Sequence, residues 1–221
     1  FSSDLIDGFT MKTMMFPGTP YLQIKLKQFQ KNGGKIIQRK VKSFDEFAGK
    51  FDVVVNCTGL GSRELCNDKK IQPARGHILR MHAPWVNHFY YIKRKKQVDI
   101  GEATYIFPRF KDVVVGGTAQ LGNWDTNVDE KETKEILDRV SEFEPTIKNA
   151  TIIDQWVGLR PVRDCVRLEK EVMDVKTQYG SKLKLQVVHN YGHGGAGMSL
   201  FWGCALEVKD LVLNALLHSA L

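Results

Sequence analysis

Residues 189–199 combine four glycines with two histidines and a serine, and they form the part of the chain best suited to bind a ligand. Glycine has no Cβ and can adopt positive φ, so its backbone can approach a ligand closely. The apolar residues after Ser199 predict a helix. A glycine loop before a helix presents free N–H groups and the positive end of the helix dipole. The stretch therefore predicts a site for an electron-rich group, and the alternative is a turn that only joins a strand to the last helix.

The residues that usually bind metals are not arranged for that purpose. His189 and His193 are four apart, but they flank glycines and not a helix, so we interpret them as hydrogen-bonding groups of a loop. The cysteines, at positions 57, 66, 165 and 204, form no C-x-x-C pair. This pattern predicts no metal site and favours a reducing compartment.

One buried strand is the clearest predicted element. Residues 51–59 are apolar and β-branched, which is typical of a strand buried on both faces of a parallel sheet. A helix over 21–32, a strand over 35–41 and a short helix capped by Ser43 and Glu46 precede it. This order predicts half of a doubly wound nucleotide-binding sheet, although no G-x-G-x-x-G occurs.

The pattern changes from residue 76 onward. Loosely alternating stretches predict antiparallel strands over 77–81, 104–109 and 112–118, and 9–15 predicts a further short strand. A charged amphipathic helix is expected over 128–144, a hairpin from 166–169 and 183–188, and a last helix over 199–218. The fold class is α/β: part of a doubly wound sheet plus a mixed, largely antiparallel sheet domain.

Composition limits the classes of partner. The chain has 221 residues, 43% of them hydrophobic, and a net charge of +7. No apolar run approaches the roughly 18 residues that a membrane span needs, so we expect no membrane contact. The basic cluster Lys93–Lys96 leaves an anionic-surface binding module open as an alternative. Aromatic residues do not interleave with this cluster, so we expect no nucleic-acid partner.

Seven ordered segments resemble the D-amino-acid oxidase family of flavoproteins, and two of them are closer to its D-aspartate oxidase branch. They are VVNCTG (54–59), QPARGHI (72–78), APWV (83–86), YIFP (105–108), VGGTAQLGNW (115–124), GLRPVR (158–163) and HNYGHGGAGMSLFWGCALE (189–207). The resemblance implies an FAD enzyme that oxidises D-amino acids with O2, giving H2O2, a 2-oxo acid and ammonia. It favours acidic substrates, and a neutral D-amino-acid oxidase is the alternative.

The resemblance also assigns residues. Arg160 and Tyr105 correspond to the groups that bind the substrate α-carboxylate, and Gly195 to the carbonyl that accepts from the amine. The flavin would lie along Gly194, Gly195, Ala196, Gly197, Met198 and Ser199, with Thr58 and the backbone of Val41 near its adenosine half. Arg94 is our choice for a second substrate carboxylate, because a guanidinium can pair with it in two parallel bonds. Hydride transfer to flavin needs no general base.

The resemblance predicts discontinuous domains. The expected substrate-binding parts are residues 1–18 and 76–159, and the FAD-binding parts are 19–75 and 160–221. The family's amino-terminal phosphate-binding loop is expected upstream of Phe1, so an inactive fragment is a further alternative. Ser219-Ala220-Leu221 weakly resembles a peroxisomal address, which together with the family predicts a peroxisomal location. The sequence leaves the oligomeric state open.

Overall fold

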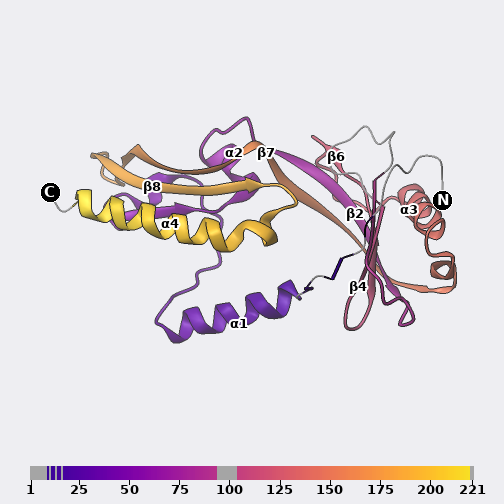
Figure 1. Ribbon diagram of the computed structural model, residues 1–221. Coiled ribbons are helices and arrows are strands. Elements are labelled where there is room, and N and C mark those ends of the chain that lie inside the picture. The colour runs from indigo at the N-terminus through magenta and orange to yellow at the C-terminus, as the bar shows by residue number, and fades with distance from the viewer. Residues whose placement is uncertain (1–8, 10, 13, 16, 94–103, 220–221) are drawn as a thin grey trace. The chain divides into compact units, whose positions relative to one another are not determined.

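The computed structural model describes residues 9, 11–12, 14–15, 17–93 and 104–219. Figure 1 labels its helices and strands. The chain divides into a first unit, residues 1–26 and 73–160, and a second unit, residues 27–72 and 161–221. Each unit is described by itself. Whether they are the expected substrate-binding and FAD-binding domains stays a prediction.

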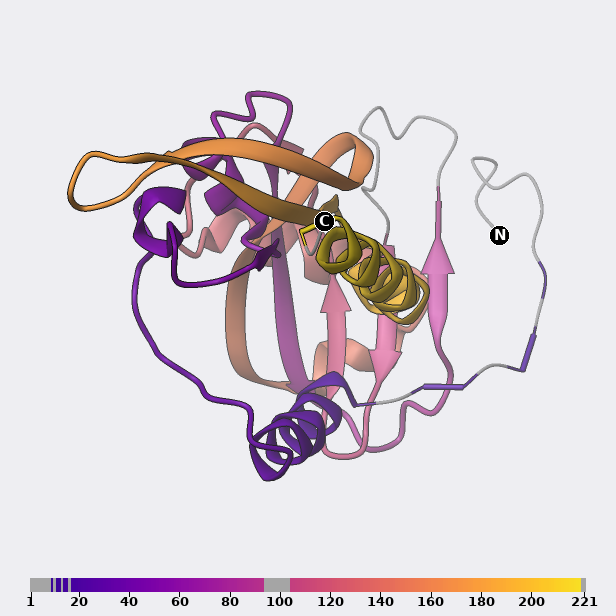
Figure 2. The same ribbon diagram turned by 90° about the vertical axis from the view of Figure 1, so that its left-hand side faces the viewer.

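The first unit is built on a largely antiparallel sheet. Its strands are β2 (Gln72–His82), β3 (Tyr90–Ile92), β4 (Thr104–Pro108), β5 (Val113–Gly116), β6 (Gln120–Leu121) and the beginning of β7 (Thr151–Lys176). Their order is β7-β2-β5-β4-β3, with β6 paired to β2. The pairs β2/β5, β4/β5 and β3/β4 are antiparallel, which confirms the strands predicted over 77–118, and Figure 2 shows neighbouring strands in alternating directions.

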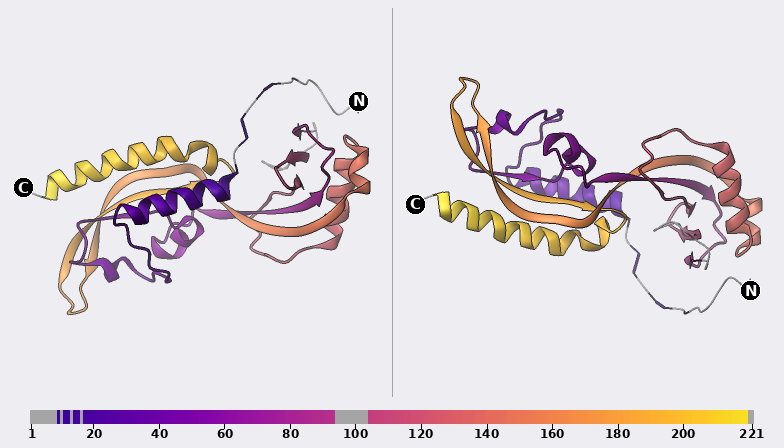
Figure 3. Two further views of the ribbon diagram at one scale, coloured as in Figure 1. Left: turned by 90° about the horizontal axis from the view of Figure 1, so that it is seen from below. Right: turned by 90° about the horizontal axis from the view of Figure 1, so that it is seen from above.

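The two faces of this sheet differ. Helix α3 (Glu130–Ser141) and the 3-10 turn η3 (Pro145–Asn149) cover one face, and Figure 3 shows α3 beside the strands. Leu79, Ile106 and Val115 are fully buried there against Ile136 and Val140. Residues one position along the same strands, among them Ile78 and Tyr105, are only half-buried. Because side chains alternate along a strand, this second face is the more open one.

The second unit contains a parallel strand pair that includes the strand predicted over 51–59. Strand β1 (Val53–Asn56) pairs in parallel with β8 (Lys182–His193), which pairs antiparallel with the later part of β7. Helix α4 (Gly197–Ser219) packs on β1 and β8, as Figure 1 shows. Phe44, Val175, Leu185 and Val187 form the core. The short elements η1 (Phe44–Phe47), η2 (Gly59–Gly61) and α2 (Ser62–Leu65) flank β1, and η1 has the predicted Ser43 and Glu46 capping box.

Three strand predictions need correction. Among the described residues β1 pairs only with β8, so it is an edge strand and Val55 is 41% exposed, not buried on both faces. Residues 35–41 form no strand, because no neighbouring strand supplies hydrogen bonds to them. The described residues between 9 and 15 are also outside any strand, and the rest of that range lies outside the described residues.

The predicted helices are present. Helix α1 (Gly18–Lys31) corresponds to the helix expected over 21–32, and it contains the division between the units, after Leu26. None of its residues is buried. Within the described residues no helix has the length and apolarity to cross a membrane, and no three side chains of the metal-binding kinds gather into a cluster.

Candidate functional site

Arg160 lies in the first unit, and its position is set by its backbone neighbours. Its Nη1 donates to the carbonyl oxygen of Thr118 at 3.2 Å. The guanidinium lies directly over Gly76 of β2, where an added Cβ would overlap it. The absence of a side chain at Gly76 therefore makes the space that Arg160 occupies.

Arg160 has no carboxylate partner among the described residues, although its side chain is half-buried. Other arginines of the chain are already paired with carboxylates, namely Arg39, Arg75, Arg80, Arg109, Arg163 and Arg167. A half-buried guanidinium costs desolvation energy unless an anion balances it. The Arg160 guanidinium, which has no carboxylate partner among the described residues, is thus suited to bind a carboxylate ligand.

Tyr105 lies beside Arg160 on the open face of the same sheet. It pairs with Gly116 on β5 and with Tyr91 on β3. Its ring lies over two glycines, because a Cβ added to Gly116 or Gly117 would be 2.6 or 2.7 Å from the hydroxyl oxygen. Burial raises the pKa of the Tyr105 phenol, and the nearby Arg160 guanidinium opposes that shift through its charge and a hydrogen bond. The fold thus brings together the two side chains expected to bind an α-carboxylate.

Sequence reasoning did not assign a role to Gly76, Gly116 and Gly117. All three lie in or directly after strands, where glycine is unfavourable unless another group must approach the backbone. That pattern in QPARGHI and VGGTAQLGNW was the signal that could have identified them. Their role is to leave room for Arg160 and Tyr105.

In the second unit, two loops emerge at the carboxyl ends of the parallel strands β1 and β8. The register places Asn56 beside His189, and the Asn56 amide is 3.1 Å from Nδ1 of that ring. The Asn56 side-chain oxygen Oδ1 accepts from both the backbone N–H and the hydroxyl of Thr58, at 3.1 and 2.8 Å. Burial lowers the pKa of His189, so the ring stays neutral near pH 7. This network fixes Thr58 at the strand end, the usual position for nucleotide ligands in such sheets.

A cavity of about 390 Å³ opens next to Thr58. Val41 and Thr58, both expected near the adenosine half of the flavin, line it together. The remaining lining residues were not predicted: Arg39, Lys40, Lys42, Gly61, Glu64 and Leu65. Its volume falls within the usual range for small-molecule pockets. Arg39 and Lys40 pair with Glu46 and Glu64, so Lys42 is the lining cation without an ion pair among the described residues, and it suits a phosphate-bearing ligand. These residues fit part of an FAD molecule.

The glycine loop before α4 also fits a cofactor. Gly192 and Gly194 have φ of +93° and +56°, conformations that favour glycine. The Gly194 N–H donates to the Pro161 carbonyl at 2.8 Å, and the N–H groups of Ser199 and Leu200 donate to Ala196 as the helix begins. Nε2 of His193 is buried without a partner among the described residues. The predicted segment from Gly194 to Ser199 therefore leads directly into the amino end of a long helix, next to an unsatisfied polar atom.

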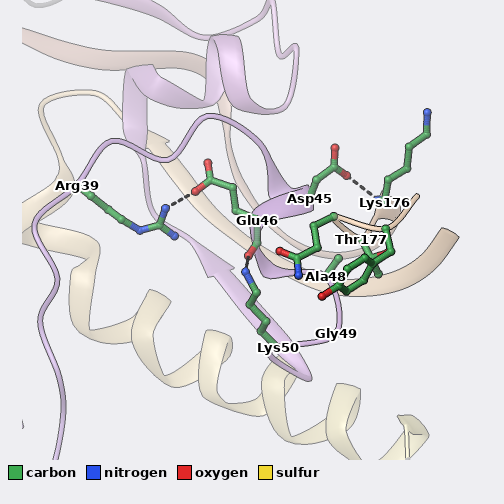
Figure 4. A pocket seen from close by; sticks show the side chains of 10 residues that line it. Arg39, Asp45, Glu46, Ala48, Gly49, Lys50, Lys176 and Thr177 are labelled. Carbon is green, nitrogen blue, oxygen red and sulfur yellow. Dashed lines mark hydrogen bonds and ion pairs between the residues drawn. The ribbon is translucent and has the colours of Figure 1, made fainter. Parts of the chain in front are cut away.

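A larger cavity, of about 820 Å³, also lies in the second unit, but its charges are used internally. Figure 4 shows Arg39 directed at Glu46, and the Lys50 ammonium donates to the Glu46 carbonyl at 3.0 Å. The Lys176 ammonium points away from the other labelled side chains, while its backbone N–H donates to Asp45 at 2.8 Å. Arg39 and Lys50 are thus engaged and the Lys176 ammonium is directed away from the other labelled side chains, so this cavity is not our candidate site.

The predicted site residues thus fall into two groups. Arg160 and Tyr105 belong to the first unit, whereas Val41, Thr58 and residues 194–199, including Gly195, belong to the second. Arg94 and the rest of 94–103 lie outside the described residues. The roles of these residues stay predictions.

Comparison with known proteins shows the family of the chain. A family profile described as FAD dependent oxidoreductase matches residues 17–211. The chain is 42% identical over 217 residues to a D-amino acid oxidase of Dugesia ryukyuensis, covering 97% of this chain and 62% of that protein. It is 43% identical over 192 residues to the D-aspartate oxidase of Homo sapiens, covering 87% of this chain and 53% of the relative. The chain therefore spans little more than half the length of these relatives.

The fold has a counterpart among solved structures. A glycine oxidase from Geobacillus kaustophilus superimposes with a TM-score of 0.57 at 23% identity, covering 73% of this chain and 41% of that one. This likeness confirms the α/β fold class. The profile and the sequence relatives confirm the resemblance found in the motifs, and the chain belongs to the FAD dependent oxidoreductase family, whose enzymes use FAD as their cofactor.

Proposed function

We propose that the protein oxidises D-amino acids with FAD as its cofactor. The observation that carries this proposal is the unpaired guanidinium of Arg160 beside the Tyr105 hydroxyl, both lying over glycines on the open face of one sheet. The named oxidases among the relatives support it. Bound FAD would supply the redox chemistry: oxidation of the D-amino acid by hydride transfer to an imino acid, which hydrolyses to a 2-oxo acid and ammonia, with O2 taking up the electrons as H2O2.

The chain's own residues bind and orient the substrate. Arg160 supplies two parallel N–H donors to the α-carboxylate, and Tyr105 supplies a third donor. Because burial raises the pKa of Tyr105, the phenol keeps its proton at neutral and mildly alkaline pH. The Gly195 carbonyl would accept from the substrate amine. No side chain has to remove the α-hydrogen as a proton.

We propose that the second unit holds the cofactor. Thr58, the Val41 backbone and the cations around the 390 Å³ cavity would bind the adenosine and phosphate parts. The loop from Gly194 to Ser199 would lie along the flavin, where the positive end of α4 and the Ser199 hydroxyl stabilise negative charge on the reduced ring. Gly195→Val should abolish retention of flavin absorbance between about 350 and 500 nm, because a branched side chain would fill the space beside the ring. Gly203→Ala is the control, since a Cβ there meets no atom within 4 Å.

Arg160→Lys tests the carboxylate site. Lysine keeps the charge but loses the paired donors, so kcat/KM should fall by an amount equivalent to about 2–4 kcal/mol. The measurement is H2O2 release with D-amino acids and their L-enantiomers. Arg109→Lys is a matched control, because Arg109 belongs to the same unit and already pairs with Asp112. An unchanged kcat/KM for Arg160→Lys would refute this role.

We further propose a preference for acidic substrates. A second carboxylate needs a cation besides Arg160, and two other arginines of the first unit are engaged: Arg75 by Glu132, and Arg139 by the Gly117 carbonyl. The basic run that begins at Lys93 supplies others, and Arg94 is our candidate. D-aspartate and D-glutamate should then be oxidised much faster than D-alanine, and Arg94→Ala should remove the preference while flavin binding persists. A wild-type preference for D-alanine would reject the acidic branch and leave the oxidase proposal standing.

A peroxisomal location is also proposed, from the family and from residues 219–221. An amino-terminal fluorescent fusion tests it by co-localisation with a peroxisomal marker. Deleting residues 219–221 should disperse the signal, and a signal that is diffuse before the deletion would reject the location.

A further inference from the structure

The segment after β5 is held by arginines from two different elements of the first unit. Nη2 of Arg139, on α3, donates to the Gly117 carbonyl at 3.1 Å, and Nη1 of Arg160, on β7, donates to the Thr118 carbonyl at 3.2 Å. Two consecutive peptide groups thus accept from two guanidinium groups. Because Arg160 donates to one of these carbonyls, the orientation of that peptide group influences where the Arg160 guanidinium lies.

The side chain of Thr118 fixes the same segment to β2. Its hydroxyl oxygen accepts from the backbone N–H of His77 at 2.9 Å. Thr118 is 6% exposed and His77 is fully buried, so water does not replace this bond easily. Thr118 consequently has two functions at one residue: its hydroxyl binds β2, and its carbonyl binds Arg160.

We propose that Thr118 is a positioning residue for the carboxylate-binding arginine. Its hydroxyl holds Thr118 and its carbonyl in place, so that Arg160 lies over Gly76 and presents its remaining N–H groups to a substrate carboxylate. The inference rests on the proposed function of Arg160, and it assigns to VGGTAQLGNW a role that the motif alone does not reveal. A purely structural threonine would stabilise the fold without affecting carboxylate binding.

Removing the hydroxyl has a defined physical consequence. Valine has nearly the shape of threonine but cannot accept a hydrogen bond, so Thr118→Val leaves the buried His77 N–H without a partner. The segment then moves toward another acceptor, and Arg160 follows its carbonyl. Arg160 binds the carboxylate in both the ground state and the transition state, so the loss raises KM and leaves kcat nearly unchanged.

The test compares three variants of the full chain loaded with FAD. Thr118→Val should raise KM for the D-amino acid about tenfold with kcat within about twofold. Thr118→Ser, which keeps the hydroxyl, should restore KM to within about twofold of wild type. Thr133→Val is the matched control: Thr133 is 5% exposed, and its hydroxyl hydrogen-bonds with the Asp129 carbonyl at 3.1 Å and the Gln155 side chain at 2.5 Å, and not with Arg160 or its Thr118 acceptor. Equal KM changes in Thr118→Val and Thr133→Val would overturn the proposal.

A second readout separates this inference from the proposed function. The arginine Nε–H resonance that disappears in Arg160→Lys reports on the position of Arg160 by NMR without any substrate. It should shift in Thr118→Val and keep its wild-type position in Thr118→Ser and Thr133→Val. If it shifts while the wild-type protein oxidises no D-amino acid, the positioning role stands and the proposed function fails. An unshifted resonance in Thr118→Val overturns the positioning role, whatever the activity.

Discussion

At the scale of single residues, what surrounds an arginine decides its role. Arg75 and Arg160 are alike in the sequence, and both belong to conspicuous motifs. In the structure Arg75 is 2% exposed and binds Glu132, whereas Arg160 contacts the Thr118 carbonyl and the Tyr105 hydroxyl and has no carboxylate partner among the described residues. The sequence motif predicted Arg160 as the carboxylate-binding residue. The physical reason is a guanidinium that lies over a glycine without a carboxylate partner, and this arrangement depends on Gly76 and Thr118. Those contacts join residues 42 and more positions apart, so local sequence could not show them.

Gly76→Ala tests the space under Arg160. An alanine Cβ would overlap the guanidinium, so Arg160 must move away from its Thr118 acceptor. We expect KM for a D-amino acid to rise by about tenfold or more while the chain still folds, because a methyl group on an open face can be accommodated by moving a flexible side chain. Gly203→Ala is the control. A wild-type KM in Gly76→Ala would show that substrate binding does not depend on this placement.

Tyr105 gives a prediction about pH. Burial raises the pKa of its phenol above the ordinary value near 10, despite the opposing charge of Arg160. The protonated phenol is the donor, and it persists up to the raised pKa. Carboxylate binding should therefore not weaken through Tyr105 ionisation as the pH rises to about 9. The measurement is the pH dependence of the inhibition constant of a simple carboxylate, in wild type and Tyr105→Phe. A decrease in affinity below pH 9 in wild type alone would contradict it.

At the scale of secondary-structure elements, the sequence predicted whether a segment is a helix or a strand better than it predicted which strands pair with one another. Helices α3 and α4 and the antiparallel strands have the clear 3.6-residue and two-residue periods that burial on one face imposes. Residues 35–41 have β-branched isoleucines but no neighbouring strand, and Ile37 is 77% exposed. Strand propensity is local, whereas strand formation needs a hydrogen-bonding partner elsewhere in the chain. Of β7, only residues 166–169 were predicted as a strand, as one arm of a hairpin. Pro161 and the register irregularity between Val162 and Arg167 interrupt the alternation of side chains along the rest of the strand.

Glu132 joins α3 to the sheet, and its loss should destabilise the first unit. It accepts from Arg75 at 2.6 Å, and it lies 3.1 Å from the His77 ring. Glu132→Gln leaves the buried Arg75 charge uncompensated, so the free energy of unfolding should fall by about 3–5 kcal/mol in urea titrations. Glu130→Gln, an exposed change on the same helix, should alter it by less than about 0.5 kcal/mol.

This effect should depend on pH in one direction. Burial would raise the pKa of Glu132, but hydrogen bonds from Arg75, His77 and Gln120 lower it below its ordinary value. The carboxylate therefore contributes its stabilisation above the unfolded pKa, and the contribution is lost as the pH falls through the folded pKa. The stability difference between wild type and Glu132→Gln should be full near pH 7 and shrink below about pH 4. A difference that grows on acidification would refute this assignment.

At the scale of the whole molecule, the chain passes between its units after Leu26, Gln72 and Arg160. Each unit has a separate apolar core. One is formed by residues such as Leu79 and Ile136, and the other by residues such as Phe44 and Leu185. The two groups of predicted site residues follow the same division. The residues that we predict to bind the substrate carboxylate and those that we predict to bind the cofactor therefore lie in different units of one chain.

Separate cores predict separate local stabilities. Ile136 on α3 is fully buried and Leu185 on β8 is 2% exposed, so replacing either with alanine should cost about 2–5 kcal/mol in its own core. Hydrogen exchange followed by mass spectrometry distinguishes them, because amides report the opening of the unit that contains them. Ile136→Ala should accelerate exchange in α3 and leave β8 close to wild type, and Leu185→Ala should do the reverse. Val172→Ala, at a position 48% exposed, is the control and should change neither. Equal acceleration of α3 and β8 by both core variants would mean that the two units open as one cooperative structure.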